Sequence, residues 1–245
     1  MTALDLVQLT SAHAAALPDD AIGLIALGAI EQHGPHLPLG TDMLLAQELA
    51  RRVAESSRRP FVIAPVPGAS LSQHHLSFAG TVTLDEETLR GHLDALVAAY
   101  TRMGLDQVAI FSAHGGNFSF LESYGRAQPN VLAFSDRRRF FAVATEAARE
   151  VGLDVPATDE HAGVIETSQA LAVFPTLVGD HQDAQGLVEP FDGWEEKMFH
   201  DGLAAVSPNG VLGDPRAATA VAGEHINDAL ANMLIKWIEE RLAIR

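Results

Sequence analysis

The sequence predicts an α/β fold in which helices cover both faces of a mainly parallel sheet. Short, continuously apolar runs alternate with longer segments whose apolar residues recur at helical spacing. This alternation is typical of strand–helix–strand units, which build parallel sheets. The 245 residues contain no internal repeat and no low-complexity tract. We therefore expect a single domain over residues 1–245.

The elements can be assigned in order along the chain. Buried strands are expected where the sequence is continuously apolar, at 22–30, 61–66, 108–111 and 131–134. Helical spacing predicts helices at 43–53, 86–103, 140–151 and 164–174. A long amphipathic helix is expected over 217–244, with apolar positions Ile226, Leu230, Met233, Leu234, Trp237, Ile238 and Leu242. The segment 179–215, rich in Gly, Pro and Asp, is expected to be irregular and to border the functional site.

Composition narrows the classes of function. A formal net charge of -16 argues against a nucleic-acid partner or an anionic membrane, because both require a basic surface. The chain has no Cys, so any metal ion would be held by His, Asp and Glu. The N-terminal residues lack a signal-peptide pattern, and no apolar stretch reaches the roughly 18 residues of a membrane helix. A cytoplasmic protein is expected.

Side chains that bind metals cluster next to the predicted strands and helices. They lie in segment 31–36 with Asp42, in segment 114–117, and in segment 159–163 with Glu166. Ligands of α/β sheets bind at the carboxyl ends of the strands, so these segments are expected to meet there. Carboxylates and neutral imidazoles suit divalent Zn, Mn and Fe. The sequence therefore predicts a two-metal hydrolase site.

Each segment also has a purely structural interpretation. Glu31 and Asp42 could cap the following helix, and His114 could be a buried histidine at a Gly-Gly turn. His161 could be an exposed loop residue beside Glu160. The functional alternative gives His161 the role of a general acid or base, because its ordinary pKa is close to neutral pH.

The loop 68–80 and the glycines after His114 are candidates for substrate contact. Gly115 and Gly116 permit close backbone approach and could offer amide N–H groups to a developing oxyanion. In the loop, one of His74 and His75 is expected to face the site.

These motifs resemble the creatininase family of metal-dependent amidohydrolases. The resemblance rests on residues 28–42, 75–81, 114–117, 161–168 and 210–215, which follow the family's order and span most of the chain. It implies a three-layer α/β/α sandwich, a dinuclear metal site and a homohexamer. It also implies two divalent ions per subunit, zinc first, with manganese or iron as alternatives.

The resemblance further implies which residues hold the ions. Glu31, Asp42 and His114 would bind one ion, and the second would share Asp42 with His33 and Glu166. A water or hydroxide between the ions would be the nucleophile.

The remaining roles concern proton transfer and substrate binding. His161, with Glu160 beside it, would transfer a proton to the leaving nitrogen. Substrate contacts are expected from His75, Gly115, Gly116 and Asn117.

The chain departs from true creatininases at several points, among them Ala79, which stands where a Pro is more usual. Gly116 stands where those enzymes carry a metal-binding Glu, and the only tryptophans are Trp194 and Trp237. The chain is therefore closer to the subgroup that takes its last ligand from the motif beginning at Glu166. The expected reaction is hydrolysis of a carbon–nitrogen bond other than an ordinary peptide bond, in a small-molecule cyclic amide, formamide or small peptide amide. The alternatives are a catalytically silent metal-binding or scaffold homo-oligomer, and a metal-dependent isomerase or lyase acting on a sugar-like substrate.

Overall fold

A parallel sheet forms the centre of the computed structural model, which describes residues 3–243. Its five strands lie in the order β1-β3-β2-β4-β5, and every pairing is parallel. The strands are β1 (Leu4–Asp5), β2 (Ile22–Leu27), β3 (Phe61–Ile63), β4 (Val108–Ser112) and β5 (Val131–Ala133). The predicted α/β class with a parallel sheet is confirmed.

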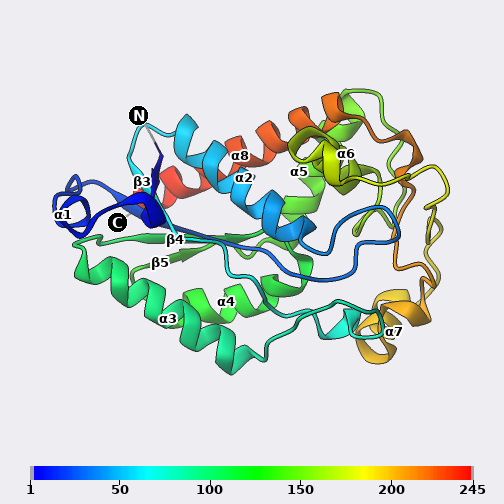
Figure 1. The fold of residues 1–245 in the computed structure, drawn as a ribbon, viewed down its shortest axis with the longest axis horizontal. Helices are drawn as coiled ribbons and strands as arrows, with labels where there is room; N and C mark the ends of the chain where they lie inside the picture. Colours follow the sequence, from blue (N-terminus) through cyan, green and yellow to red (C-terminus); the bar gives the residue numbers. More distant parts are fainter. Residues whose placement is uncertain (1–2, 244–245) are drawn as a thin grey trace.

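Helices cover both faces of the sheet, so the molecule has three layers (Figure 1). One layer contains α2 (Thr41–Ser56), α5 (Arg137–Glu150), α6 (Val164–Val173) and α8 (Ala220–Leu242). The opposite layer contains α3 (Glu86–Arg102) and α4 (Phe118–Ala127). Two further helices, α1 (Ser11–Ala14) and α7 (Trp194–Asp201), lie beyond the two ends of the sheet in Figure 1.

Strand β2 shows why its sequence is continuously apolar. Ile22, Leu24 and Ala26 pack on the side of α2 and α8, whereas Ile25 and Leu27 pack on the side of α3. Successive strand residues point to opposite faces, and here both faces are covered. All six residues of the strand are buried.

Several element boundaries differ from the sequence-based expectation. Strand β2 ends at Leu27 and β3 at Ile63, each three residues earlier than predicted. Helix α5 begins at Arg137, because the carboxylate of Asp136 caps it by accepting a hydrogen bond from Arg139 N. The segment 179–215 contains helix α7, and α8 begins at Ala220 after the Thr219 cap. The predicted last residue of that helix, 244, lies outside the described residues.

The connections explain where the sheet can bind a ligand. Strands β2 and β4 are neighbours, with Leu27 paired to Ser112 at their carboxyl ends. After β2 the chain passes through α2 to β3 on one side, and after β4 it passes through α4 to β5 on the other. Such a point of divergence leaves the crevice in which open α/β sheets bind ligands.

Gly28 determines how closely the first turn of α2 approaches the end of β2. A Cβ atom at Gly28 would lie 2.5 Å from Met43 Cα and 2.6 Å from Met43 N. Gly28→Ala should therefore lower the free energy of unfolding by about 1–3 kcal/mol, as overpacking does. Urea denaturation measures this change.

Gly91→Ala is the matched control for that substitution. Gly91 lies within α3 and has no heavy atom within 4 Å of the added Cβ. It should raise the free energy of unfolding by roughly 0.5–1 kcal/mol, because glycine is unfavourable inside a helix. Equal effects of the two alanines would contradict the close-approach argument.

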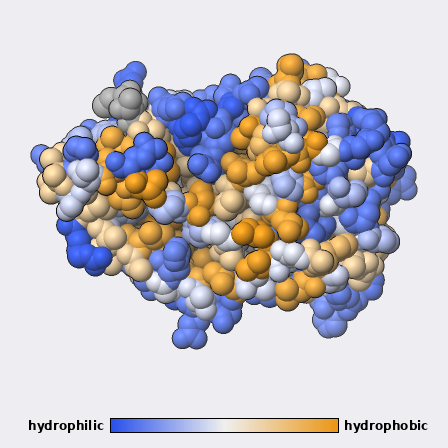
Figure 2. All heavy atoms as spheres, in the orientation of Figure 1, coloured by the Kyte–Doolittle hydropathy of each residue, from blue (hydrophilic) through white to orange (hydrophobic). Residues whose placement is uncertain are grey.

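Apolar side chains also appear on the surface. Leu39, Leu76, Val82 and Phe199 are exposed, and Figure 2 shows apolar residues gathered across the middle of the face it displays. Contiguous apolar surface of this kind is typical of interaction sites, and the expected homo-oligomer stays a prediction. Among residues 3–243, no helix combines the length and the apolar composition needed to cross a membrane.

Candidate metal centre

The carboxyl ends of β2 and β4 and the first turns of α2 and α6 bring the predicted ligands together. Glu31 and His33 follow β2, and His114 follows β4. Asp42 is the second residue of α2, and Glu166 lies in the first turn of α6. The capping interpretation of Asp42 is wrong, because Gly40 is the N-cap and the Asp42 side chain is buried in the cluster.

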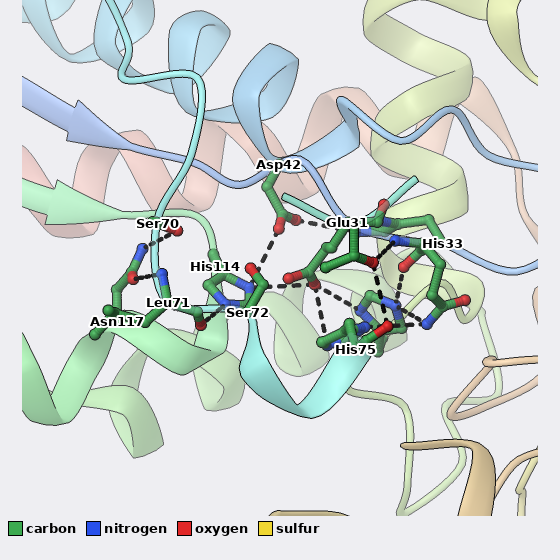
Figure 3. Close-up of polar contacts among 12 residues, drawn as sticks. Glu31, His33, Asp42, Ser70, Leu71, Ser72, His75, His114 and Asn117 are labelled. Atoms are coloured by element: carbon green, nitrogen blue, oxygen red, sulfur yellow. Dashed lines mark hydrogen bonds and ion pairs between the residues drawn. The ribbon is translucent and has the colours of Figure 1, made fainter. Parts of the chain in front are cut away.

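Asp42 connects two halves of the cluster through different oxygen atoms (Figure 3). Its Oδ1 lies 3.1 Å from His33 Nε2, and its Oδ2 lies 3.2 Å from His114 Nδ1. Glu31 Oε1 is 3.3 Å from His114 Nδ1 on one side. Glu166 Oε2 is 3.7 Å from His33 Nε2 on the other. A carboxylate with this environment can bridge two cations.

The buried carboxylates of this cluster lack sufficient hydrogen bonds. Glu31 and Asp42 are almost completely buried, yet both oxygens of Glu31 and Oδ2 of Asp42 accept no hydrogen bond. An ionised carboxylate without partners is costly to bury, unless it is paired or coordinates a metal. The donor set of three carboxylates and two imidazoles therefore fits divalent cations.

Burial and the close approach of carboxylates and imidazoles shift the pKa values within the cluster. Burial would lower the pKa of His33, but the carboxylates of Asp42 and Glu166 outweigh burial and raise that pKa to about 10. Burial, together with the negative charge of Asp42, raises the pKa of Glu166 to about 8. Without cations, the cluster thus favours bound protons. Divalent ions would replace those protons, because ligands must be deprotonated to bind a metal.

Backbone carbonyls orient the two proposed imidazole ligands. His33 Nδ1 lies 3.1 Å from Glu31 O, so Nδ1–H donates and Nε2 faces the cluster. His114 Nε2 lies 2.9 Å from Leu71 O, so Nε2–H donates and Nδ1 faces the cluster. Such contacts fix the tautomer of metal-binding histidines. A Cβ at Gly116 would come within 2.5 Å of both His114 Nε2 and Leu71 O, so glycine is required beside this hydrogen bond.

His161 and His75 complete the same cluster. Within the described residues, Glu31, His75 and His161 form one group of potential ligand atoms, and His33, His161 and Glu166 form another. His161 precedes Ala162, whose left-handed φ of 53° is rare outside glycine. This conformation directs the Ala162 N–H to Glu166 Oε2, at 2.5 Å. Burial and the nearby His33 lower the pKa of His161, which favours a neutral ring.

A pocket opens onto the cluster, and most of the predicted substrate-binding residues line it. His75, Gly115 and Gly116 are among the lining residues, as is His74. Asn117 is not: its amide is buried and bonds Ser70 Oγ and Ser112 Oγ, while its oxygen accepts from Leu71 N. In place of the predicted substrate contact, Asn117 holds the loop that positions His114.

Glu160 occupies the edge of this pocket and not the ligand cluster. Its carboxylate pairs with the guanidinium of Arg137, which also lies over the ring of Phe141, 5.0 Å from its centroid. Burial raises the pKa of Glu160, and the charge of Arg137 opposes that rise.

Sequence reasoning did not identify Gln32, which contacts two histidines of the pocket, or several residues that line the pocket itself. Gln32 is buried between the two ligands of the first motif, and its position there was the available signal. The pocket walls also contain Phe141, Met198 and Phe199. Nothing in the sequence around these apolar residues distinguishes them from core residues.

Comparisons with known proteins show which family this chain is similar to. Residues 8–238 match the family Creatininase, described as creatinine amidohydrolase. A mycofactocin precursor peptide peptidase from Mycobacterium ulcerans (strain Agy99) is 35% identical over 213 residues, covering 83% of this chain and 78% of the relative. A creatinine amidohydrolase from Pseudomonas putida is 28% identical over an alignment of 246 residues, covering 90% of each chain.

Solved structures show the same fold. A mutant creatininase of the Zn-Zn type has a TM-score of 0.77 and 25% identity, covering 98% of this chain and 99% of its own. A creatininase described as Mn has a TM-score of 0.75 and 26% identity, with the same coverage. The relatives named here hydrolyse carbon–nitrogen bonds, and the related structures include Zn-Zn and Mn forms.

Proposed function

We propose that this chain, which belongs to the creatininase family, hydrolyses the carbon–nitrogen bond of a small amide with the help of two divalent ions. The observation that carries the proposal is the position of Asp42, whose two oxygens face different imidazoles in a buried cluster. Glu31, Asp42 and His114 would hold one ion. His33, Asp42 and Glu166 would hold the other.

Zinc is the first candidate, with manganese or iron as alternatives. Imidazole and carboxylate ligands accept all three metals, and the Zn-Zn and Mn forms of related structures support the first two. When bound, two divalent ions supply a water of lowered pKa as nucleophile and polarise the scissile carbonyl.

The chain's own residues would then handle protons and shape the pocket. His161 faces Glu31 through Nδ1, at 3.6 Å, and burial lowers the pKa of His161, which favours the neutral ring. That nitrogen would accept a proton and later give it to the leaving nitrogen. Glu160, at the pocket edge, would bind substrate together with Arg137. Phe141, Met198 and Phe199 would exclude water from the reacting amide.

The substrate is expected to be a cyclic amide, a formamide or a small peptide amide. The peptide class comes first, because the relative at 35% identity is a peptide peptidase. Trp194 and Trp237 are absent from the pocket lining, where Phe141 and Phe199 supply the aromatic surface. A pocket built in this way differs from one that encloses its substrate between tryptophans.

Hydrolysis in water enriched in oxygen-18 tests the reaction. Zinc- or manganese-loaded protein would be incubated with creatinine, an N-formyl compound and a set of short peptides, and the products analysed by mass spectrometry. We expect one class to yield a product carboxylate with one solvent oxygen. A product without solvent oxygen would favour the isomerase or lyase alternative, and no product from fully metal-loaded protein would favour the scaffold.

A further inference from the structure

The side chain of Gln32 lies between two histidines of the pocket. We infer that Gln32 is a positioning residue that decides which ring nitrogen of His75 carries a hydrogen, while its main-chain carbonyl does the same for His161. Gln32 is 5% exposed and stands between the proposed ligands Glu31 and His33. The inference rests on the proposed function where His161 transfers a proton and where zinc affinity is measured, but the tautomers themselves do not depend on it.

Two main-chain groups fix the orientation of the Gln32 amide. Gly34 N donates to Gln32 Oε1 at 2.9 Å, and Gln32 Nε2 donates to Gly210 O at 3.0 Å. If the amide were flipped, its NH₂ group would face the donor Gly34 N and its oxygen would face the acceptor Gly210 O. Gly210 leaves the space for this contact, because a Cβ there would lie 2.0 Å from Gln32 Oε1.

The remaining hydrogen of the amide determines the state of His75. Gln32 Nε2 has two hydrogens but three neighbours: Gly210 O, His75 Nδ1 at 3.1 Å and His161 Nε2 at 3.0 Å. His161 Nε2 also lies 2.8 Å from Gln32 O, which only accepts, so His161 Nε2 must donate. The second amide hydrogen therefore goes to His75 Nδ1, which must accept it.

Both rings thus carry a hydrogen on Nε2, with different consequences. His75 Nε2, which carries the hydrogen, lies 3.2 Å from the buried carboxylate oxygen Glu31 Oε1 without forming a well-aligned hydrogen bond to it. His161 presents Nδ1, without a hydrogen, toward the same oxygen at 3.6 Å. Contacts of this kind orient metal ligands, and their loss typically lowers metal affinity or activity by about 10–100-fold. Gln32 would therefore act on the metal centre through His75.

Long-range proton–nitrogen NMR correlation of ¹⁵N-histidine-labelled protein reads the tautomers directly, in metal-free and zinc-loaded samples. His75→Gln and His161→Gln spectra assign the two rings. We expect hydrogen on Nε2 of both rings in the wild type. In Gln32→Glu the new carboxylate accepts hydrogen bonds, so the His75 hydrogen should move to Nδ1 while His161 is unchanged, and zinc affinity should fall about 10–100-fold.

Gln169→Glu is the matched control, because the Gln169 amide is also buried but bonds Asn227 Oδ1 between α6 and α8. It should leave both tautomers unchanged. A wild-type His75 with hydrogen on Nδ1, or a folded Gln32→Glu protein with an unchanged His75, would overturn the inference. If Gln32→Glu does not fold, the inference is tested by the wild-type spectrum and by the spectrum of Gln32→Met, which also lacks the amide donor. If the expected tautomers are observed but no amide is hydrolysed, the proposed function is wrong and this inference still holds.

Discussion

Asp42→Asn should lose both metal ions at once. One oxygen of Asp42 faces His33 and the other faces His114, so a single carboxylate serves both halves of the centre. The amide keeps only one oxygen and brings an NH₂ group that cannot bind a cation. The fall in metal affinity should therefore exceed the roughly 10–100-fold typical of losing a residue that only orients a ligand. Elemental analysis after dialysis at fixed free zinc measures it.

Asp106→Asn is the control for Asp42→Asn. It removes the same charge from an exposed position beyond α3, so metal content should stay at the wild-type level. Circular dichroism should show that both variants fold. Two ions retained by Asp42→Asn under these conditions would show that Asp42 does not bridge.

His161→Ala should lower turnover by about 10²–10⁴-fold, the usual scale for a lost general acid or base. The fold and the metal content should persist, because the proposed ligand set does not include His161. Single-substrate kinetics on the amide identified by the oxygen-18 experiment would measure kcat, with metal content determined on the same samples.

His92→Ala controls for the loss of a histidine, since His92 is exposed on α3, a helix that contributes no residue to the cluster. Unchanged turnover in His161→Ala would exclude His161 from proton transfer. Loss of one ion would instead make His161 a ligand, which its position in two groups of potential ligand atoms permits.

The elements that build the centre were predictable because their sequence signals are strong. Strands β2 and β4 are covered on both faces, and this produces the apolar runs that identify them. Glu31 and His114 directly follow these runs, and the edge of a parallel sheet brings them together. The family resemblance added the pairing of Asp42 with both halves of the centre, which spacing alone left open.

Other elements gave weaker signals for identifiable reasons. Helix α4 has no side-chain cap, because its N-cap residue Asn117 uses its amide to hold the loop before η2 (Gln73–His75), the short 3₁₀ helix that carries His75. Helix α7 has eight residues and lies between Gly193 and Gly202, both with positive φ, so it resembles a loop in sequence. Strand β1 has two residues, which is too short for any periodicity.

The walls of the pocket could not be predicted because they depend on tertiary packing. Phe199 lies on α7, far along the chain from the metal-binding motifs, and its ring reaches His74 with centroids 5.0 Å apart. Arg137 belongs to the basic run 137–139, and its ion-pair partner in the pocket, Glu160, lies 23 residues further along the chain. The way the loops fold back over the sheet determines which side chains face a pocket. No local sequence pattern predicts this arrangement.

Metal content per chain decides whether the proposed dinuclear centre exists. Protein purified without chelator or nickel affinity would be analysed beside Glu31→Gln and Glu166→Gln, which alter opposite halves of the centre. The proposed dinuclear site predicts about two ions per wild-type chain, with fewer in each variant. Wild-type protein that holds no metal, and takes up none when zinc, manganese or iron is added, would contradict the account.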